Sequence, residues 1–193
     1  ALISQSEELE ICGVGMNPSR IGILSVLRDM GARIEIKNAR EESGEPIADL
    51  IVLPSKLSGV ILDGSIIPNI IDEIPILSIA AAFAEGETII RDAAELRVKE
   101  SDRLKAISDG LLNLGVSHIN FDDGIKIKGN PRLLDLPGPV QIDSYDDHRI
   151  AMSFLIAGLN CNQPITVLDC DNILTSFPAF IELTASLGYN LEK

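Results

Sequence analysis

The most informative stretch for the fold of this chain is DEIPILSIAAAFAEGETIIRD (residues 72–92). It opens with a carboxylate, continues with residues that would be apolar on every side of a helix, turns at Gly86 and ends in a short β-branched run. A helix that is apolar all round is a buried helix. The stretch therefore predicts a buried helix followed by a strand, which is an α/β arrangement with the helix inside.

A second stretch, DHRIAMSFLIAGLNCNQPITVLD (residues 147–169), repeats this pattern. Asp72 precedes Lys99 by 27 residues and Asp147 precedes Thr175 by 28, and an amphipathic helix follows in both places. The agreement predicts two copies of one unit, in the order buried helix, strand, loop, outer helix, strand, strand.

Three amphipathic helices share a further feature, because a Gly and then an alternating strand follow each of them. Gly in this place is typical of the left-handed position that ends a helix. The segments are GILSVLRDMGARIEI (22–36), AISDGLLNLGVSHINF (106–121) and FIELTASLGYNLE (180–192), with the glycines at Gly31, Gly115 and Gly188.

The first of these helices has no buried helix before it. The stretch LEICGVGMNPSRIG (residues 9–22) supplies a strand and predicts a helix start at 17–19. We therefore predict one α/β domain of repeated units with buried helices and outer sheets. The units span roughly residues 1–60, which is incomplete, 61–135 and 136–193. The turn-rich stretches 39–46 and 129–140 are expected to be loops between units.

Composition limits the classes of function. Of the 193 residues 46% are hydrophobic, but 4% are aromatic and none is Trp, which is typical of an α/β protein packed with aliphatic side chains. The formal charge of -13 and the pI near 4.5 argue against binding nucleic acid or an anionic membrane by bulk attraction. An anionic ligand would need a local cluster of cations.

Cysteine usage and the termini add three expectations. Cys12, Cys161 and Cys170 show no spacing typical of a disulfide framework or a zinc site, and we interpret them as cytoplasmic thiols. No uninterrupted apolar stretch has the length of about 18 residues that a membrane span needs, and no signal peptide is indicated. The chain starts at Ala1 without Met, which predicts a longer parent protein.

The stretch ELRVKESDRL (residues 95–104) crowds charged side chains where a helix begins. The simplest interpretation is that Asp102 caps the helix and that Arg103 and Lys105 are solvated. However, the dipole at a helix start disfavours cations such as Lys99 and Arg103, and its free N–H groups suit an anion. Cations beside those donors indicate a site for a phosphate or carboxylate.

Two further helix starts carry ionisable residues. In SYDDHRIAM (residues 144–152), Asp147 and Arg149 could be a structural pair with His148 as a hydrogen-bonded neighbour, and Asp72 could be an ordinary helix cap. If the units are arranged alike, these helix starts converge with that of residues 95–104. The pattern then predicts a site for an anionic, phosphorylated ligand with acid–base groups beside it.

The two charged strings carry a resemblance to a known family. ELRVKESDRL and DDHRIAMSF (146–154), with IPNIIDEIPILSIAAAFAEGETIIRDA (67–93) before them and TSFPAFIELTASLG (175–188) after them, resemble the 5-enolpyruvylshikimate-3-phosphate synthase family. The resemblance covers the C-terminal half of such enzymes. It implies the enolpyruvyl transferase fold, with two inside-out α/β barrel-like domains of three βαβαββ units each and helix N-termini facing the cleft between them. It also implies that the N-terminus of the whole protein crosses over to complete this domain.

The resemblance implies a reaction of the shikimate pathway, which leads to chorismate and the aromatic amino acids. The enolpyruvyl group of phosphoenolpyruvate is transferred to the 5-hydroxyl of shikimate 3-phosphate through a tetrahedral ketal that loses phosphate. By position, Asp72 matches the aspartate that contacts the shikimate hydroxyls and can act as a base. Glu100 matches the glutamate that moves the proton at the methylene carbon, and Lys99 matches the lysine between the two substrates.

The other matched residues concern phosphoenolpyruvate. Arg103 and Arg149 match the pair that binds its carboxylate, and Asp147 and His148 match residues that orient the site. The family uses no metal and no cofactor. Thr175 departs from the Lys that many members have before this Phe-Pro pair and that reaches the phosphate, although a subgroup that includes enzymes tolerant to glyphosate, the inhibitor of this family, also has TSFP.

The expected partners are the two anionic substrates and the missing N-terminal half, in a cytoplasmic enzyme that is a monomer when complete, and neither nucleic acid nor membrane is expected. The chain alone is expected to be inactive. Three alternatives stay open: half of a UDP-N-acetylglucosamine enolpyruvyl transferase, a non-catalytic half-domain that docks to a partner, and an unrelated cytoplasmic repeat scaffold.

Overall fold

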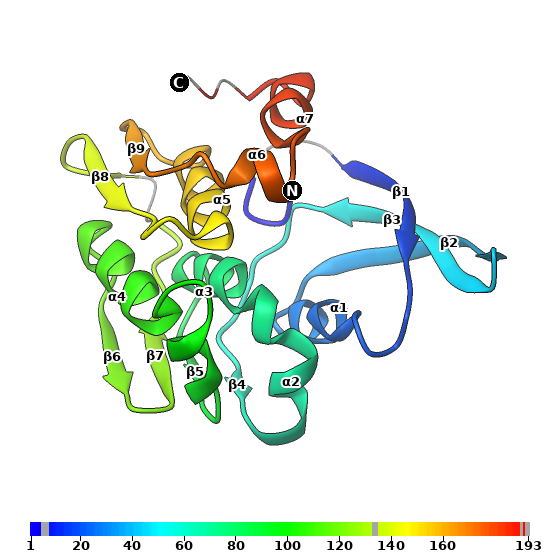
Figure 1. Ribbon diagram of the computed structural model, residues 1–193, viewed down its shortest axis with the longest axis horizontal. Coiled ribbons are helices and arrows are strands. Elements are labelled where there is room, and N and C mark those ends of the chain that lie inside the picture. The colour runs from blue at the N-terminus through cyan, green and yellow to red at the C-terminus, as the bar shows by residue number, and fades with distance from the viewer. Residues whose placement is uncertain (5–7, 133–134, 190, 192–193) are drawn as a thin grey trace.

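The structure is a computed structural model that describes residues 1–4, 8–132, 135–189 and 191 (Figure 1). It is a mixed α/β fold in which the helices α3 and α5 lie near the middle and the sheets lie around them. The elements of its first part form an antiparallel sheet in the order β1-β3-β2, with one helix against it. They are β1 (Leu9–Gly15), α1 (Gly22–Asp29), β2 (Arg33–Glu42) and β3 (Glu45–Leu53).

The second part forms a four-stranded sheet in the order β4-β5-β7-β6. β4 and β5 are parallel, and β7 is antiparallel to both β5 and β6. Along the chain the elements follow the order strand, helix, strand, helix, strand, strand. They are β4 (Ile61–Leu62), η1 (Gly64–Ile66), α2 (Ile67–Ile70), η2 (Ile71–Glu73), α3 (Ile74–Ala82), β5 (Glu87–Ile90), η3 (Ala94–Val98), α4 (Arg103–Asn113), β6 (His118–Phe121) and β7 (Gly124–Lys128).

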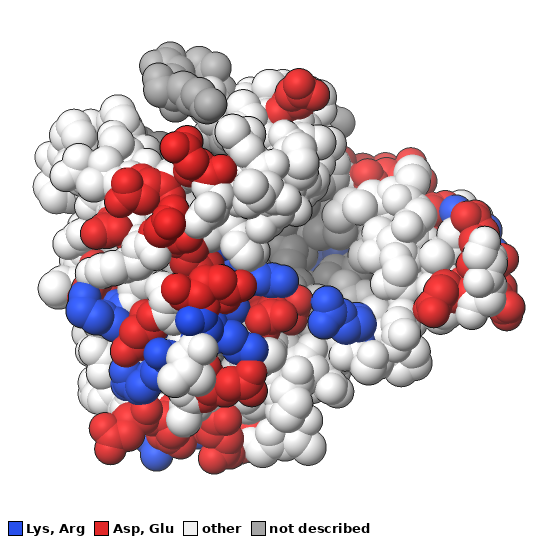
Figure 2. Space-filling model, in the orientation of Figure 1, with Lys and Arg blue, Asp and Glu red and all other residues white. Residues whose placement is uncertain are grey.

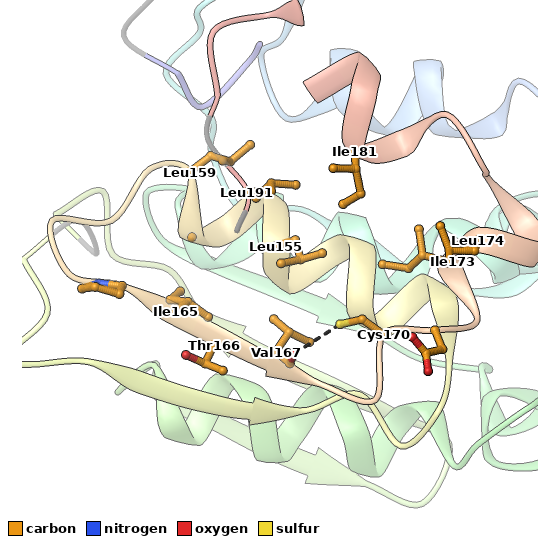
Figure 3. Close-up of a pocket in the computed structure, with 13 residues that line it drawn as sticks. Leu155, Leu159, Ile165, Thr166, Val167, Cys170, Ile173, Leu174, Ile181 and Leu191 are labelled. Atoms are coloured by element: carbon orange, nitrogen blue, oxygen red, sulfur yellow. Dashed lines mark hydrogen bonds between the residues drawn. The ribbon is translucent and has the colours of Figure 1, made fainter. Parts of the chain in front are cut away.

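The third part has a sheet of two parallel strands among the described residues. Its helix α5 packs against α3 and contributes Phe154, which is 1% exposed, to the core. The other side of α5 faces helices and a cavity of about 650 Å³ that Leu155 and Leu159 line (Figure 3). The elements are β8 (Val140–Asp143), α5 (His148–Gly158), β9 (Ile165–Leu168), α6 (Ile173–Ser176) and α7 (Phe180–Ser186).

Helix α3 is buried as its composition predicts. Seven residues of α3 are buried, on all sides of the helix. The helical run Gly64–Ala82 has 19 residues and a mean hydropathy of 1.4, which by length and composition alone would suit a membrane span. Half of it is buried inside the structure, and Asp72 and Glu73 interrupt it, so it is a core helix.

The three predicted helix ends are confirmed. Gly31, Gly115 and Gly188 each follow the C-cap residue of α1, α4 and α7 and have φ of 95°, 71° and 83°. A left-handed backbone is nearly free of strain for Gly because it has no Cβ. The strand expected after Gly188 falls largely on residues outside the described part of the chain.

Two expectations about local structure are wrong. Residues 39–46 are not a loop between units, because β2 continues to Glu42 and a tight turn at Ser43 and Gly44 leads into β3. Both turn residues have positive φ, which suits the twist of a hairpin. The first helix begins at Gly22 rather than at 17–19, where the Arg20 N–H instead donates to the Asn17 carbonyl in a turn.

A close approach of α4 and α5 gives the first prediction. A Cβ at Gly110 would lie 2.1 Å from Cζ of the buried Phe154. Gly110→Ala is expected to lower the free energy of unfolding by about 1–2 kcal/mol, because so short a contact puts the overpacking cost near the upper end of about 1–3 kcal/mol, and helix propensity returns only about 1 kcal/mol. Urea unfolding measures the change, with Leu112→Ala on the exposed side of α4 as control. A Gly110→Ala chain as stable as the original would contradict the packing described here.

Candidate active site at three helix starts

Arg103 is the centre of the charged cluster. It is the first residue of α4, and its side chain is 0% exposed. Its guanidinium donates from Nε to Asp147 Oδ2 (2.8 Å), from Nη1 to Asp72 Oδ1 (3.1 Å) and from Nη2 to Glu100 Oε2 (2.6 Å). Burial alone would lower the pKa of Arg103, but these carboxylates raise it. The buried cation is stabilised because each side of its planar fork has a charged partner.

Asp147 joins the start of α5 to the start of α4. Its side chain is 0% exposed, and its Oδ1 accepts from the backbone N–H of Arg149 (2.9 Å) and Ile150 (3.4 Å), so it is the N-cap of α5. Its Oδ2 accepts from Arg103 and from the Ser101 hydroxyl (3.2 Å). Burial would raise the pKa of Asp147, but Arg103 and the cap N–H groups hold it below the ordinary value. Asp147 is therefore paired with Arg103, not with Arg149 as one sequence interpretation had it.

Asp72 is not a helix cap. It lies in η2, one residue before the N-cap of α3, and its carboxylate points at cations. Its oxygens lie 3.1 Å from Arg103 Nη1, 3.9 Å from Lys99 Nζ and 3.7 Å from Arg149 Nη2. Burial would raise the pKa of Asp72, but the charges of Arg149, Arg103 and Lys99 lower it. Asp72 therefore joins its own segment, η2, to the start of α4 and to the start of α5.

Lys99 and Arg149 are the cations of this cluster with exposed surface. The side chain of Lys99 is 22% exposed and contacts Glu95, and that of Arg149 is 31% exposed. Arg149 donates from Nη1 to the Asp72 carbonyl (2.9 Å) and lies 3.8 Å from Glu73 Oε1. Figure 2 shows Lys and Arg gathered over the region of α3 and α4, among Asp and Glu. A ligand anion can reach these two side chains directly.

The access of a ligand to Arg103 differs from the simple expectation. Each nitrogen of its guanidinium already donates to a carboxylate, so in this structure Arg103 offers a substrate no nitrogen that lacks a carboxylate partner. Of the three carboxylates, Glu100 has the most exposed side chain, at 51%, against 28% for Asp72 and 0% for Asp147. A substrate carboxylate that binds Arg103 would therefore displace Glu100 at least cost.

The remaining predicted residues lie at the edge of the cluster. His148 is the first residue of α5 and is half-buried. Asp102 caps α4 as predicted, because its carboxylate accepts from the Lys105 N–H (3.0 Å). Lys105 is not merely solvated, since it binds the Asp109 carboxylate and the Tyr145 hydroxyl. Thr175 is exposed on α6, and within the described ranges no contact links it to the cluster.

Sequence reasoning missed several members of this network. The Glu95–Lys99 contact has the i, i+4 spacing of helical ion pairs and could have been found. The Tyr145 contacts span about forty residues of sequence, and no local pattern indicates them. In the residues that the structure describes, no group of His, Cys, Asp and Glu side chains is arranged to hold a metal ion.

The larger described cavity is not this site. It lies between α5, β9, α6 and α7, and aliphatic side chains such as Ile165, Val167 and Ile173 line it (Figure 3). An anionic ligand needs donors or cations, and these are gathered at the cluster around Arg103 instead. The three helix starts are therefore the candidate site for an anionic ligand, despite the greater volume of the aliphatic cavity.

The lowered pKa of Asp72 gives a prediction for acid. Its folded pKa lies below the unfolded value of about 3.9, so its ionic contacts stabilise the fold fully above that value and are lost as the pH falls through the folded pKa. The chain should therefore be more stable than its Asp72→Asn variant at pH 5 and above, and the difference should shrink below about pH 4. Urea unfolding of both proteins between pH 7 and pH 3 measures it, and a difference that grows on acidification would contradict the sign.

Three comparisons with known proteins agree with each other. A family model described as EPSP synthase (3-phosphoshikimate 1-carboxyvinyltransferase) matches residues 1–183. The 3-phosphoshikimate 1-carboxyvinyltransferase of Magnetococcus marinus is 49% identical over 192 residues, which are 100% of this chain and 43% of that protein. This chain thus spans less than half the length of the curated relative.

Solved structures give the same result. An EPSP synthase from Acinetobacter baumannii superposes with a TM-score of 0.91 and 42% identity, over 96% of this chain and 43% of that one. The enolpyruvyl transferase NikO from Streptomyces tendae superposes with a TM-score of 0.74 over 96% of this chain and 39% of its own. At 22% identity, NikO shows the shared fold alone.

Proposed function

This chain belongs to the EPSP synthase family, and on that premise we propose that it is the C-terminal part of an enzyme that joins phosphoenolpyruvate to shikimate 3-phosphate. The enzyme transfers the enolpyruvyl group to the 5-hydroxyl and releases phosphate. The single observation that carries the proposal is the convergence of three helix starts on the buried Arg103, with Lys99 and Arg149 exposed beside it. Such a place suits two anionic substrates even in a chain of net charge -13.

The proposed roles of the cations follow from exposure and geometry. Arg149 binds the phosphoenolpyruvate carboxylate, and Arg103 adds a second planar donor pair when Glu100 moves away. Lys99 lies between the two substrates and stabilises their negative charge. Asp147 and His148 orient the start of α5, and Asp147 holds Arg103.

The proposed proton transfers use the acidic residues. Asp72 accepts a hydrogen bond from the 5-hydroxyl, and its lowered pKa keeps it ionised at neutral pH for this role. The hydroxyl oxygen bonds to C2 of phosphoenolpyruvate while Glu100, which has left Arg103 and taken a proton from solvent, gives that proton to C3, which forms the tetrahedral ketal. The C–O bond to phosphate then breaks, and Glu100 takes the proton back from C3. Asp72 takes the proton that leaves the hydroxyl, and the Lys99 ammonium stabilises the negative charge that develops.

We assign the chain to one domain of a two-domain enzyme. The order of elements supports three units, at roughly residues 1–60, 61–135 and 136–193, of which the second has the full βαβαββ order. Buried helices and outer sheets would make this an inside-out α/β barrel-like domain, with the missing N-terminal half as the other wall of the cleft. The complete enzyme would be a cytoplasmic monomer without metal or cofactor. Because Thr175 carries no charge, cations elsewhere in the enzyme would bind the phosphate.

A phosphate-release assay on the complete enzyme tests the proposed function. With phosphoenolpyruvate present, we expect release with shikimate 3-phosphate as the acceptor and none with UDP-N-acetylglucosamine. Phosphate release with UDP-N-acetylglucosamine as the acceptor, but not with shikimate 3-phosphate, would support the alternative transferase. No release with either acceptor, from an enzyme that is folded by circular dichroism, would favour a non-catalytic docking domain.

A further inference from the structure

The turn just before Asp147 has an unusual backbone. The Asp147 N–H donates to the Ser144 carbonyl (3.1 Å), and the two central residues, Tyr145 and Asp146, have φ of 54° and 58°. Positive φ at both central positions defines a type I′ turn, for which Asn-Gly is the preferred pair. A Tyr side chain is strained at such a position, so something outside the turn must hold it in place.

The side chain of Tyr145 supplies that hold on one side. Its hydroxyl donates to Asp109 Oδ2 (2.6 Å) and accepts from Lys105 Nζ (2.6 Å), and Lys105 Nζ also donates to the same Asp109 oxygen (2.6 Å). The Tyr145 N–H donates to Asp143 Oδ1 (2.7 Å). These three side chains, Lys105, Asp109 and Tyr145, form what we call the tyrosine triangle. Two of its members belong to α4.

Backbone contacts hold the other side of the turn. The Asn172 side chain donates to the Asp146 carbonyl (2.6 Å), and the Ser144 hydroxyl donates to the Asp169 carbonyl (2.8 Å). These contacts involve no side-chain atom of Asp146, which is exposed. A turn that served only to reverse the chain could therefore use Gly at 145 and 146 with less strain. The hydroxyl of Tyr145 is the part that Gly could not replace.

The tyrosine triangle connects α4 and α5, the same two helices that the Arg103–Asp147 contact of the charged cluster connects. α4 begins with Arg103 and carries Lys105 and Asp109 on its next turns. Asp147 follows the turn directly, caps α5 and binds Arg103. The hydroxyl of Tyr145 therefore fixes the start of α5 against α4 at a second place, in addition to the Asp147–Arg103 contact.

We propose that Tyr145 is a positioning residue, which holds Asp147 and through it Arg103 and Arg149 in the geometry that binds the phosphoenolpyruvate carboxylate. The inference rests on the proposed function for the identity of that ligand. It assigns Tyr145 no contact with either substrate. Loss of the Tyr145 hydroxyl should therefore weaken the binding of phosphoenolpyruvate more than that of shikimate 3-phosphate.

The test uses the complete enzyme with Tyr145→Phe, which keeps the ring and removes the hydroxyl. We expect the KM for phosphoenolpyruvate to rise about tenfold, as for the loss of one hydrogen bond to a charged group, with the KM for shikimate 3-phosphate within about twofold. Asp109→Asn should act in the same direction, and it carries the test if Tyr145→Phe fails to fold. Asp146→Gly is the matched control, since it relieves strain without losing a contact, and its KM values should stay within about twofold.

Three results would overturn the proposal: an unchanged KM for phosphoenolpyruvate in Tyr145→Phe, equal rises in both KM values, or the same rise in Asp146→Gly. Amide hydrogen exchange separates its failure from that of the proposed function. Exchange at the N–H groups of Arg149 and Ile150 should speed up at least about tenfold in Tyr145→Phe, whichever substrates the enzyme uses. Unchanged exchange would overturn the positioning role, whereas an inactive but normally exchanging wild-type enzyme would overturn only the proposed reaction.

Discussion

Replacing Asp147 with Ala is expected to lower the free energy of unfolding by about 3–5 kcal/mol, because it takes a carboxylate from the fully buried Arg103. The same change removes the N-cap of α5, which alone is worth about 1 kcal/mol. A domain has about 5–15 kcal/mol of stability in total, so the variant should be only marginally folded. Urea unfolding followed by circular dichroism gives the change.

Two further variants separate the causes of this loss. Asp147→Asn keeps an oxygen for the cap and loses the charge, so it should cost less than Asp147→Ala. Adding Arg103→Met to Asp147→Ala should recover part of the stability, since the incompletely paired buried cation is then gone. If the double variant instead loses as much stability as Asp147→Ala and Arg103→Met lose separately when added together, the Asp147–Arg103 pair is not the stabilising interaction.

Replacing Glu100 with Gln in the complete enzyme is expected to lower kcat by about 10²–10⁴-fold, the usual contribution of a group that transfers protons in the transition state. Gln has nearly the same shape and can still accept from Arg103 Nη2, so substrate binding should change little. Phosphate release at saturating phosphoenolpyruvate and shikimate 3-phosphate gives kcat, and equilibrium binding of the substrates gives their affinity.

The control for Glu100→Gln is Glu87→Gln, another acid-to-amide change, in β5. Glu87 pairs with Lys126 across the sheet and has no contact with the cluster among the described residues. Its kcat should stay within about twofold of the original enzyme, as for most surface substitutions. A Glu100→Gln enzyme with an unchanged kcat would remove Glu100 from the proton transfer.

Much of the fold could be predicted because its signals are local. Gly31, Gly115 and Gly188 mark helix ends wherever the helices pack, and the composition of α3 requires burial whatever its neighbours are. The stretch 39–46 was misassigned because its Gly and Pro indicate a break, whereas a tight turn at Ser43 lets the flanking residues pair as strands.

The site was less predictable because its contacts join distant residues. The sequence indicated which charged residues meet, since the repeat places them at matching helix starts. It could not show that Arg103 donates to three carboxylates. Two of them, Asp72 and Asp147, lie 31 and 44 residues away in sequence, and only tertiary packing brings them within hydrogen-bond distance. The strained turn at Tyr145 contains no Gly, Asn or Pro, and its Ser and Asp residues are weaker turn signals that also suit a helix cap.

In the proposed function, this chain supplies one wall of a substrate site that the rest of the enzyme completes. The most direct measurement is phosphate release from phosphoenolpyruvate and shikimate 3-phosphate by the 193-residue chain, by the remaining half and by their mixture. We predict no turnover by either part and measurable turnover by the mixture. Turnover by this chain alone, or none by a mixture of two folded parts that bind each other, would contradict the account.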